Sequence, residues 1–144
     1  EGLIEFIEHT VFALLNQIVP PGDSAPAASA DTGVRQAGRV VGVLLQFAEK
    51  NPGMARVMVG DALVFENERL QQRMNQFFDR VESTLRQCLR AAAQSAGSDT
   101  PTMDAQVRAA VLTAFVMGRL QRFTRSGFRR VPSEHLDASL ALML

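Results

Sequence analysis

The longest periodic segment of the chain runs from Ala62 to about Ala93 and has the spacing of an α-helix. Its apolar residues recur every three or four positions: Leu70, Met74, Phe77, Phe78, Val81, Leu85, Cys88 and Leu89. A helix with one apolar face is stable only where other elements cover that face. Nowhere does a useful length of sequence alternate apolar and polar residues as a half-buried strand does. The sequence therefore predicts an all-α domain built around this segment.

Helical spacing predicts further helices on both sides of this segment, with turn residues between them. The first runs from Leu3 to about Val19, where Pro20-Pro21-Gly22 ends it. The second follows a cap at Asp31 or Thr32 and stops at Asn51-Pro52-Gly53. Three more are expected: a short helix from Met54 to Val59 capped by Asn51, a helix opened by Thr100-Pro101 or Thr102, and a final helix from Ser133 or Glu134 onward.

The segment from Ala109 to Gly118 is apolar on almost every side of a helix, with Thr113 as its one polar residue. A small bundle normally leaves each helix one solvated face, so this segment predicts a second chain on its outer side. The final helix is similarly apolar. We therefore expect a homodimer through these two helices, with interface residues Leu112, Val116, Leu120, Leu136 and Leu140.

Composition excludes several classes of function. The 144 residues include fifteen basic and fifteen acidic residues, so the overall charge does not attract the chain to nucleic acid or to an anionic membrane. One Cys and two His, far apart in the sequence, predict no metal site, and no phosphate-binding loop or nucleophile elbow indicates an enzyme or a cofactor. Cys88 lies among core positions, no apolar run is long enough to cross a membrane, and we expect a soluble cytoplasmic domain.

Two positions on the predicted first and second helices break the amphipathic pattern. Phe6 projects outside the apolar stripe of the first helix. On the polar side of the second helix, Arg39, Val43, Gln46 and Lys50 recur at helical steps, so that Val43 lies within a basic rim. An exposed aromatic ring beside such a rim suits a short amphipathic peptide with acidic residues, although scattered exposed apolar residues would give the same pattern.

Three other features leave alternatives open. The arginines at 119, 122, 125, 129 and 130 are typical of a solvated helix end, or of an anion site. Gly38 and Gly42 indicate close approach of another helix more than a ligand site. The methionines at 54, 58, 74, 103 and 117 and the nine Phe are consistent with ordinary core packing, or with an apolar ligand pocket.

The order of helices and several local sequences resemble the C-terminal regulatory domain of TetR-type transcription regulators, and among these the nucleoid occlusion factors. The matching stretches are Leu3-Ile4-Glu5-Phe6-Ile7-Glu8, Asn51-Pro52-Gly53, Ala62-Leu63-Val64-Phe65-Glu66, Arg69-Leu70-Gln71, Arg73-Met74-Asn75-Gln76-Phe77-Phe78, Leu85-Arg86-Gln87 and Arg122-Phe123-Thr124-Arg125-Ser126-Gly127-Phe128. The resemblance covers nearly the whole chain except residues 20–33 and 95–105. It implies that residues 1–144 are a dimerisation and partner-binding domain.

The resemblance also implies what this domain does. A helix-turn-helix DNA-binding domain would precede residue 1, consistent with a first helix that has no cap and a chain that ends without one. When bound to DNA, such regulators antagonise polymers of the tubulin-like division protein FtsZ. By position, Phe6, Val43, Lys50 and Asn51 match partner-binding residues, while Leu14, Gln46 and the longer loop at 20–33 depart from the family pattern. The alternative function is a repressor with a small-molecule pocket among the second helix, the long helix and the helix from Thr102.

Overall fold

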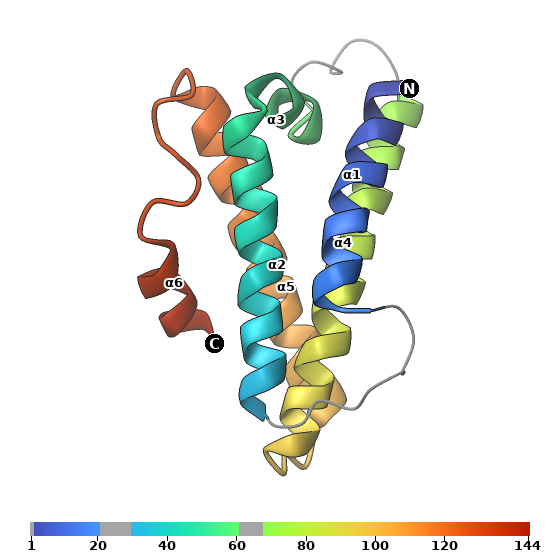
Figure 1. The fold of residues 1–144 in the computed structure, drawn as a ribbon, viewed down its shortest axis with the longest axis vertical. Coiled ribbons are helices and arrows are strands. Elements are labelled where there is room, and N and C mark those ends of the chain that lie inside the picture. The colour runs from blue at the N-terminus through green and yellow to red at the C-terminus, as the bar shows by residue number, and fades with distance from the viewer. Residues whose placement is uncertain (1, 21–29, 61–67) are drawn as a thin grey trace.

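The computed structural model describes residues 2–20, 30–60 and 68–144, and in these ranges all regular secondary structure is helical. The helices are α1 (Gly2–Ile18), α2 (Ala30–Lys50), α3 (Pro52–Met58), α4 (Glu68–Ser95), α5 (Pro101–Arg125) and α6 (Leu136–Met143). Figure 1 shows α1, α2 and α4 along the long axis of the molecule, α5 behind α2, α3 across one end and α6 on the flank. The predicted all-α class is confirmed.

The core lies where α1, α2, α4 and α5 meet, and it uses the apolar stripes that the sequence predicts. Ile7, Leu44, Leu85 and Leu112, one from each of these helices, have no exposed surface. Around Phe77 the packing is aromatic, with the Phe12 ring 5.3 Å away in an edge-to-face arrangement. Such contacts add to the stabilisation that burial of the rings already provides.

Glycine allows α2 to pack closely against α4, and two further glycines of α2 face α6. A Cβ atom at Gly33 would lie 2.4 Å from the carbonyl oxygen of Cys88, so only glycine fits there as α2 crosses α4. On another side of α2, the hydrogen positions of Gly38 and Gly42 face Leu140 and Leu136 of α6. The expected approach of another helix at this glycine pair is confirmed, and Gly38 also lines a hollow of about 490 Å³ between α2 and α6.

Helix α6 is held by Arg119 of α5. The guanidinium donates hydrogen bonds to the carbonyl oxygen of Pro132 at 2.9 Å, to that of Glu134, and to the hydroxyl of Ser139 at 3.2 Å. Burial lowers the pKa of Arg119 from its ordinary value, and the nearby charge of Arg122 acts in the same direction. One arginine therefore fixes both the segment before α6 and the helix itself.

Three local expectations need correction, and a fourth is untested. The second helix begins at Ala30, so Asp31 lies inside its first turn and pairs with Arg35 at 3.2 Å instead of capping it. Asn51 precedes α3 without a capping side-chain bond, because its amide donates to the Phe47 carbonyl oxygen at 2.9 Å. The last helix begins at Leu136, after a left-handed His135, rather than at Ser133 or Glu134. The start predicted at Ala62 lies outside the described residues.

Candidate partner-binding and dimer surfaces

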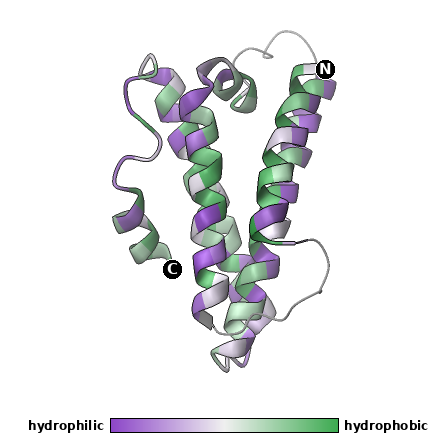
Figure 2. Cartoon of the chain, in the orientation of Figure 1, coloured by the Kyte–Doolittle hydropathy of each residue, from purple (hydrophilic) through white to green (hydrophobic). Residues whose placement is uncertain are grey.

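The two flanks of α1 have different surroundings. Glu8 pairs with Arg73 of α4, and Phe12 contacts both the Phe77 ring and the Arg80 guanidinium, so this flank faces α4. At about 100° per residue, Leu3, Thr10 and Leu14 project from the opposite flank, and Phe6 lies between that flank and the outermost line of the helix. Leu3 is 43% exposed and Phe6 50%. Figure 2 shows that hydrophobic residues colour much of α1.

The flanks of α2 differ in the same way. Gly38 and Gly42 contact α6, and Glu49 accepts a hydrogen bond from the Ser133 amide on that side. Val43 and Lys50 lie toward the other flank, together with Gln36. Arg39 and Gln46 lie on the outermost line between the two flanks, and Arg39 lines a hollow with Leu136 and Asp137 of α6. Val43 is half-buried against the core, whereas Arg39 and Lys50 are exposed. The basic rim around an apolar residue that the sequence predicts is therefore present on α2.

A hydrogen bond between α1 and α2 shows which residues of the two helices lie at the same level. The Gln36 side chain donates to the carbonyl oxygen of Ile18 at 3.1 Å. The helices run in opposite directions from this point (Figure 1). At a rise of 1.5 Å per residue, Phe6 lies about 18 Å from Ile18 along α1, and Lys50 lies about 21 Å from Gln36 along α2. Phe6 and Lys50 are therefore at nearly the same level of the bundle.

These flanks meet in one surface, which we call the α1–α2 face: Leu3, Phe6 and Leu14 of α1 with Val43 and Lys50 of α2. Counted from the same bond, Val43 lies about 10 Å along α2, between the levels of Phe6 and Leu14. Phe6, Val43 and Lys50, which the sequence brought into one predicted site, thus share a face of the molecule. Asn51 is half-buried at the end of this face, where its side chain closes the last turn of α2.

The structure corrects the residues expected at the dimer interface. Leu112, Val116 and Leu120 have no exposed surface, because they form the inward side of α5 in the core of a single chain. Leu136 and Leu140 are half-buried and turn toward α2. A second chain could not contact the three α5 residues without opening the core.

The outward side of α5 is apolar along most of its length. Its exposed apolar and small residues are Met103, Val107, Ala110, Val111, Ala114, Met117 and Gly118, with exposed Gln106 and Arg108 at the edges and Gln121 and Arg125 beyond them. Val107 is 54% and Val111 47% exposed, and on α6 Leu142 is 90% exposed. We call these residues the α5–α6 stripe. Exposed apolar surface on this scale is characteristic of an interaction site.

The arginine series divides into two parts. Arg119 binds the segment that leads into α6, as described above, and Arg130 pairs with Glu134 at 3.2 Å. Arg122, Arg125 and Arg129 are exposed around the C-terminal end of α5. The α5 dipole favours cations at that end. The role of Arg119 was missed from the sequence, because its partners are carbonyl groups that only the folded segment at 132–134 brings near.

The remaining candidates for reactive or metal-binding groups are the cysteine and the two histidines. Cys88 is buried, and burial raises the pKa of its thiol to about 12, so it is a core residue rather than a thiolate nucleophile. His9 is exposed, and His135 lies 3.7 Å from the Glu134 carboxylate. Over the described residues, no three His, Cys, Asp or Glu side chains are grouped as metal ligands. No helix in the same ranges could span a membrane.

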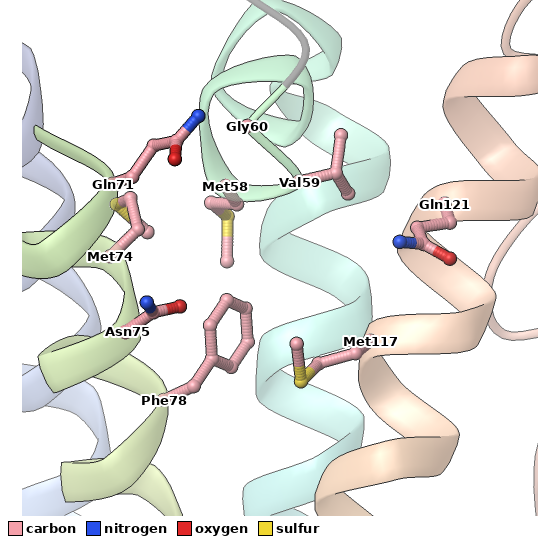
Figure 3. Close-up of a pocket in the computed structure, with 9 residues that line it drawn as sticks. All are labelled: Met58, Val59, Gly60, Gln71, Met74, Asn75, Phe78, Met117 and Gln121. Atoms are coloured by element: carbon pink, nitrogen blue, oxygen red, sulfur yellow. The ribbon is translucent and has the colours of Figure 1, made fainter. Parts of the chain in front are cut away.

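A cavity of about 290 Å³ lies at the end of the bundle between α3, α4 and α5 (Figure 3). Met58, Met74, Met117 and Phe78 provide apolar walls, and Gln71, Asn75 and Gln121 provide amides. Those three polar residues are exposed, so the cavity is open to solvent on their side. It differs from the expected pocket, because α3 lines it in place of α2.

An all-helical domain with a long α4, an apolar outward side on α5 and a short terminal α6 is the class of domain found at the C-terminus of TetR-type regulators. A model of the SlmA-like C-terminal domain, described as tetracyclin repressor-like, matches residues 31–144. The chain therefore belongs to this SlmA-like family of TetR-type C-terminal domains.

Curated relatives agree with this assignment. The nucleoid occlusion factors SlmA of Vibrio atlanticus and Vibrio cholerae are each 42% identical to the chain over 143 residues, which is 99% of this chain and 68% of theirs. SlmA of Idiomarina loihiensis is 37% identical over the same length. All three relatives are named nucleoid occlusion factors.

Proposed function

We propose that this chain is the dimerisation and partner-binding domain of a nucleoid occlusion regulator, and that its α1–α2 face binds the division protein FtsZ. The observation that carries the proposal is the half-exposed Phe6 at the level of Lys50, next to the half-buried Val43. An aromatic anchor beside an apolar patch and a cation fits an amphipathic tail with acidic residues. The 42% identity to SlmA supports the same function.

The domain acts as a homodimer through the α5–α6 stripe. Exposed Val107, Val111 and Leu142 support this surface, because water contact with so much apolar area is unfavourable. Ala114 and Gly118 lie on the same line of α5, and their small side chains would let two helices approach closely. A specific dimer of this kind buries on the order of 1,200 Å² or more in total.

DNA binding belongs to a separate helix-turn-helix domain before residue 1, and the regulator works in the cytoplasm on the nucleoid. The balanced charge of residues 1–144 supports this division of roles, since DNA binding depends strongly on basic residues. By holding FtsZ at chromosomal sites, the regulator would prevent the division ring from closing over the nucleoid. No enzymatic activity and no cofactor are part of this function.

The second candidate is a ligand-responsive repressor. The cavity between α3, α4 and α5 favours it, because three methionines and a phenylalanine with three amide side chains suit a small apolar ligand with a few polar groups. A ligand bound there would raise the melting temperature of the chain. The α1–α2 face would have no part in such a response.

A binding titration distinguishes the two candidates. The chain is titrated with a labelled peptide of the FtsZ C-terminal tail at low and at physiological salt. Saturable binding that weakens with salt and is lost with Phe6→Ala supports the proposal. Absence of tail binding at both salt concentrations, with the chain folded and dimeric, would contradict it.

A further inference from the structure

We infer that the cavity between α3, α4 and α5 is part of a binding site that two copies of the chain complete together, and that this site takes an uncharged bicyclic aromatic molecule with an amide-like edge. Such a site rests on the dimer surface of the proposed function and is independent of FtsZ binding. Binding of the aromatic molecule and dimerisation are then coupled.

The wall of the cavity reaches the α5–α6 stripe. Met117 belongs to the stripe, where its side chain is 39% exposed, and it also lines the cavity. Exposed Gln121 lines the same cavity one turn further along α5, on the same line of the helix as Ala114. Figure 3 shows Met117 and Gln121 reaching from α5 toward the α4 side of the cavity. A second copy that covers the stripe therefore lies against the open side of the cavity.

The lining of the cavity is uncharged. None of the nine described residues around it is an acid, a base or a histidine. An ion that entered such a site would lose hydration without gaining an ion pair, which is unfavourable. The site therefore selects a neutral molecule.

The volume of the cavity and its apolar walls favour an aromatic ring system. An apolar protein cavity of about 150 Å³ can hold one benzene molecule. The cavity of this chain, about 290 Å³, is nearly twice as large and has room for two fused rings. Met58, Met74 and Met117 provide sulfur atoms, which make favourable contacts with aromatic rings, and Phe78 provides a ring of its own.

Three amide side chains stand at the open side of the cavity, those of Gln71 and Asn75 on α4 and of Gln121 on α5. Each amide can both donate and accept hydrogen bonds. Within the described ranges, none of these three side chains is bonded to another residue. A ligand edge that carries a donor and an acceptor, such as a carboxamide, is complementary to them.

Closure of the open side by a second copy couples the two binding events. The part of the ligand at the open side is in water in a monomer, whereas in a dimer it contacts the partner chain. The ligand therefore binds the dimer more tightly than the monomer. By linkage, it strengthens dimerisation by the same factor for each site that it occupies. Such coupling typically amounts to about five-fold or more in affinity.

A pair of probes of the same shape tests the site: neutral 2-naphthamide and charged 2-naphthoate. Calorimetry measures the affinity of each probe for the chain, and sedimentation equilibrium measures the dimer dissociation constant. We expect 2-naphthamide to bind one site per chain and 2-naphthoate to bind about ten-fold more weakly or worse. Saturating 2-naphthamide should lower the dimer dissociation constant about five-fold or more.

Gln71→Leu and Gln76→Leu form a matched pair of variants, since both glutamines of α4 are exposed and only Gln71 lines the cavity. Gln71→Leu should weaken binding of 2-naphthamide by about two- to ten-fold, whereas Gln76→Leu should leave it unchanged. Val111→Arg places a charge on the stripe without touching the cavity lining. The resulting monomer should also bind 2-naphthamide more weakly than the wild-type dimer.

Absence of 2-naphthamide binding, equal affinity for the two probes, or unchanged binding in Gln71→Leu would overturn the assigned ligand class. Equal affinity of 2-naphthamide for the wild-type dimer and the Val111→Arg monomer would overturn the shared site. All of these results would leave FtsZ tail binding and the dimer surface of the proposed function intact. A wild-type chain that is monomeric at micromolar concentration would contradict that dimer surface, and the shared site with it.

Discussion

Arg119 of α5 donates a hydrogen bond to the hydroxyl of Ser139 on α6 at 3.2 Å, and the same guanidinium holds the carbonyl oxygens of Pro132 and Glu134. Its other face lies over the Phe115 ring, 4.6 Å from the centroid. No residue of α6 is fully buried, so Arg119 attaches the helix together with the half-buried Leu136, Leu140 and Met143, which pack against the core. The position of α6, and with it one part of the α5–α6 stripe, therefore depends on Arg119.

The first prediction concerns this attachment. Arg119→Ala removes the shared donor of two carbonyl groups and should destabilise the docked α6 by about 1–3 kcal/mol. Amide hydrogen exchange should become faster in α6 and in residues 128–135, while α2 and α4 keep their protection. Arg122→Ala is the control, since no hydrogen bond to α6 would be lost. Unchanged exchange in α6 of the Arg119 variant would contradict this role.

The second prediction concerns the crossing of α2 and α4. A Cβ at Gly33 would lie 2.4 Å from the Cys88 carbonyl oxygen and 2.7 Å from the Ala92 Cβ, so Gly33→Ala must push the helices apart. We expect a loss of about 1–3 kcal/mol in the free energy of unfolding. Gly53→Ala, which meets nothing within 4 Å, should be neutral or slightly stabilising. Urea unfolding measures both variants, and equal stabilities would contradict the close approach.

The third prediction separates the two sides of α5. Val111 is exposed and Val116 is buried, so the same substitution should have different effects at the two positions. Val111→Arg should give a folded monomer, because it places a charge on the α5–α6 stripe. Val116→Arg should unfold the chain, because it places an unpaired charge in the core.

Light scattering and circular dichroism report these outcomes. A wild-type chain that is monomeric at micromolar concentration, or a Val111→Arg variant that remains a dimer, would contradict the dimer surface proposed for α5.

The fourth prediction is a pH dependence at the start of α5. Hydrogen bonds from Ser98 and Thr100 lower the pKa of Asp104 below its ordinary value. An aspartate in an unfolded chain has a pKa of about 3.9. Because the pKa of Asp104 is lower in the folded chain, its ionised carboxylate stabilises the fold above about pH 3.9, and this stabilisation is lost as the pH falls through the folded-state pKa. The stability difference between wild type and Asp104→Asn should therefore be largest above about pH 5 and shrink toward pH 2. A difference that grows on acidification would exclude this assignment.

Sequence periodicity predicted the helices because their polar and apolar sides differ. It placed α1, α2 and the end of α4 within a few residues of their observed bounds. On α5 the same reasoning could not choose the inward side. Val111 and Leu112 are adjacent and both apolar, yet one is exposed and the other has no exposed surface. Where a helix is apolar on all sides, its sequence does not show which side faces the core. In α5, packing against α4 and α2 decides which residues are buried.

The candidate site was predictable to a similar extent. An exposed Phe6 and the basic rim around Val43 follow from their positions on the two helices, and the structure bears out that exposure. That the two lie on one face depends on the register between α1 and α2, which the Gln36 hydrogen bond to Ile18 fixes. No local sequence pattern predicts a contact between residues eighteen positions apart.

The central claim is that Phe6 is a partner-binding residue, and the most direct measurement is tail affinity and melting temperature for Phe6→Ala beside Phe12→Ala. Phe12 is buried against Phe77, so its truncation should cost about 3–5 kcal/mol of stability. Phe6 is half-exposed, so its truncation should barely change the melting temperature but weaken binding of the FtsZ tail by about 1–3 kcal/mol. A large drop in the melting temperature of Phe6→Ala with unchanged tail affinity would contradict the account.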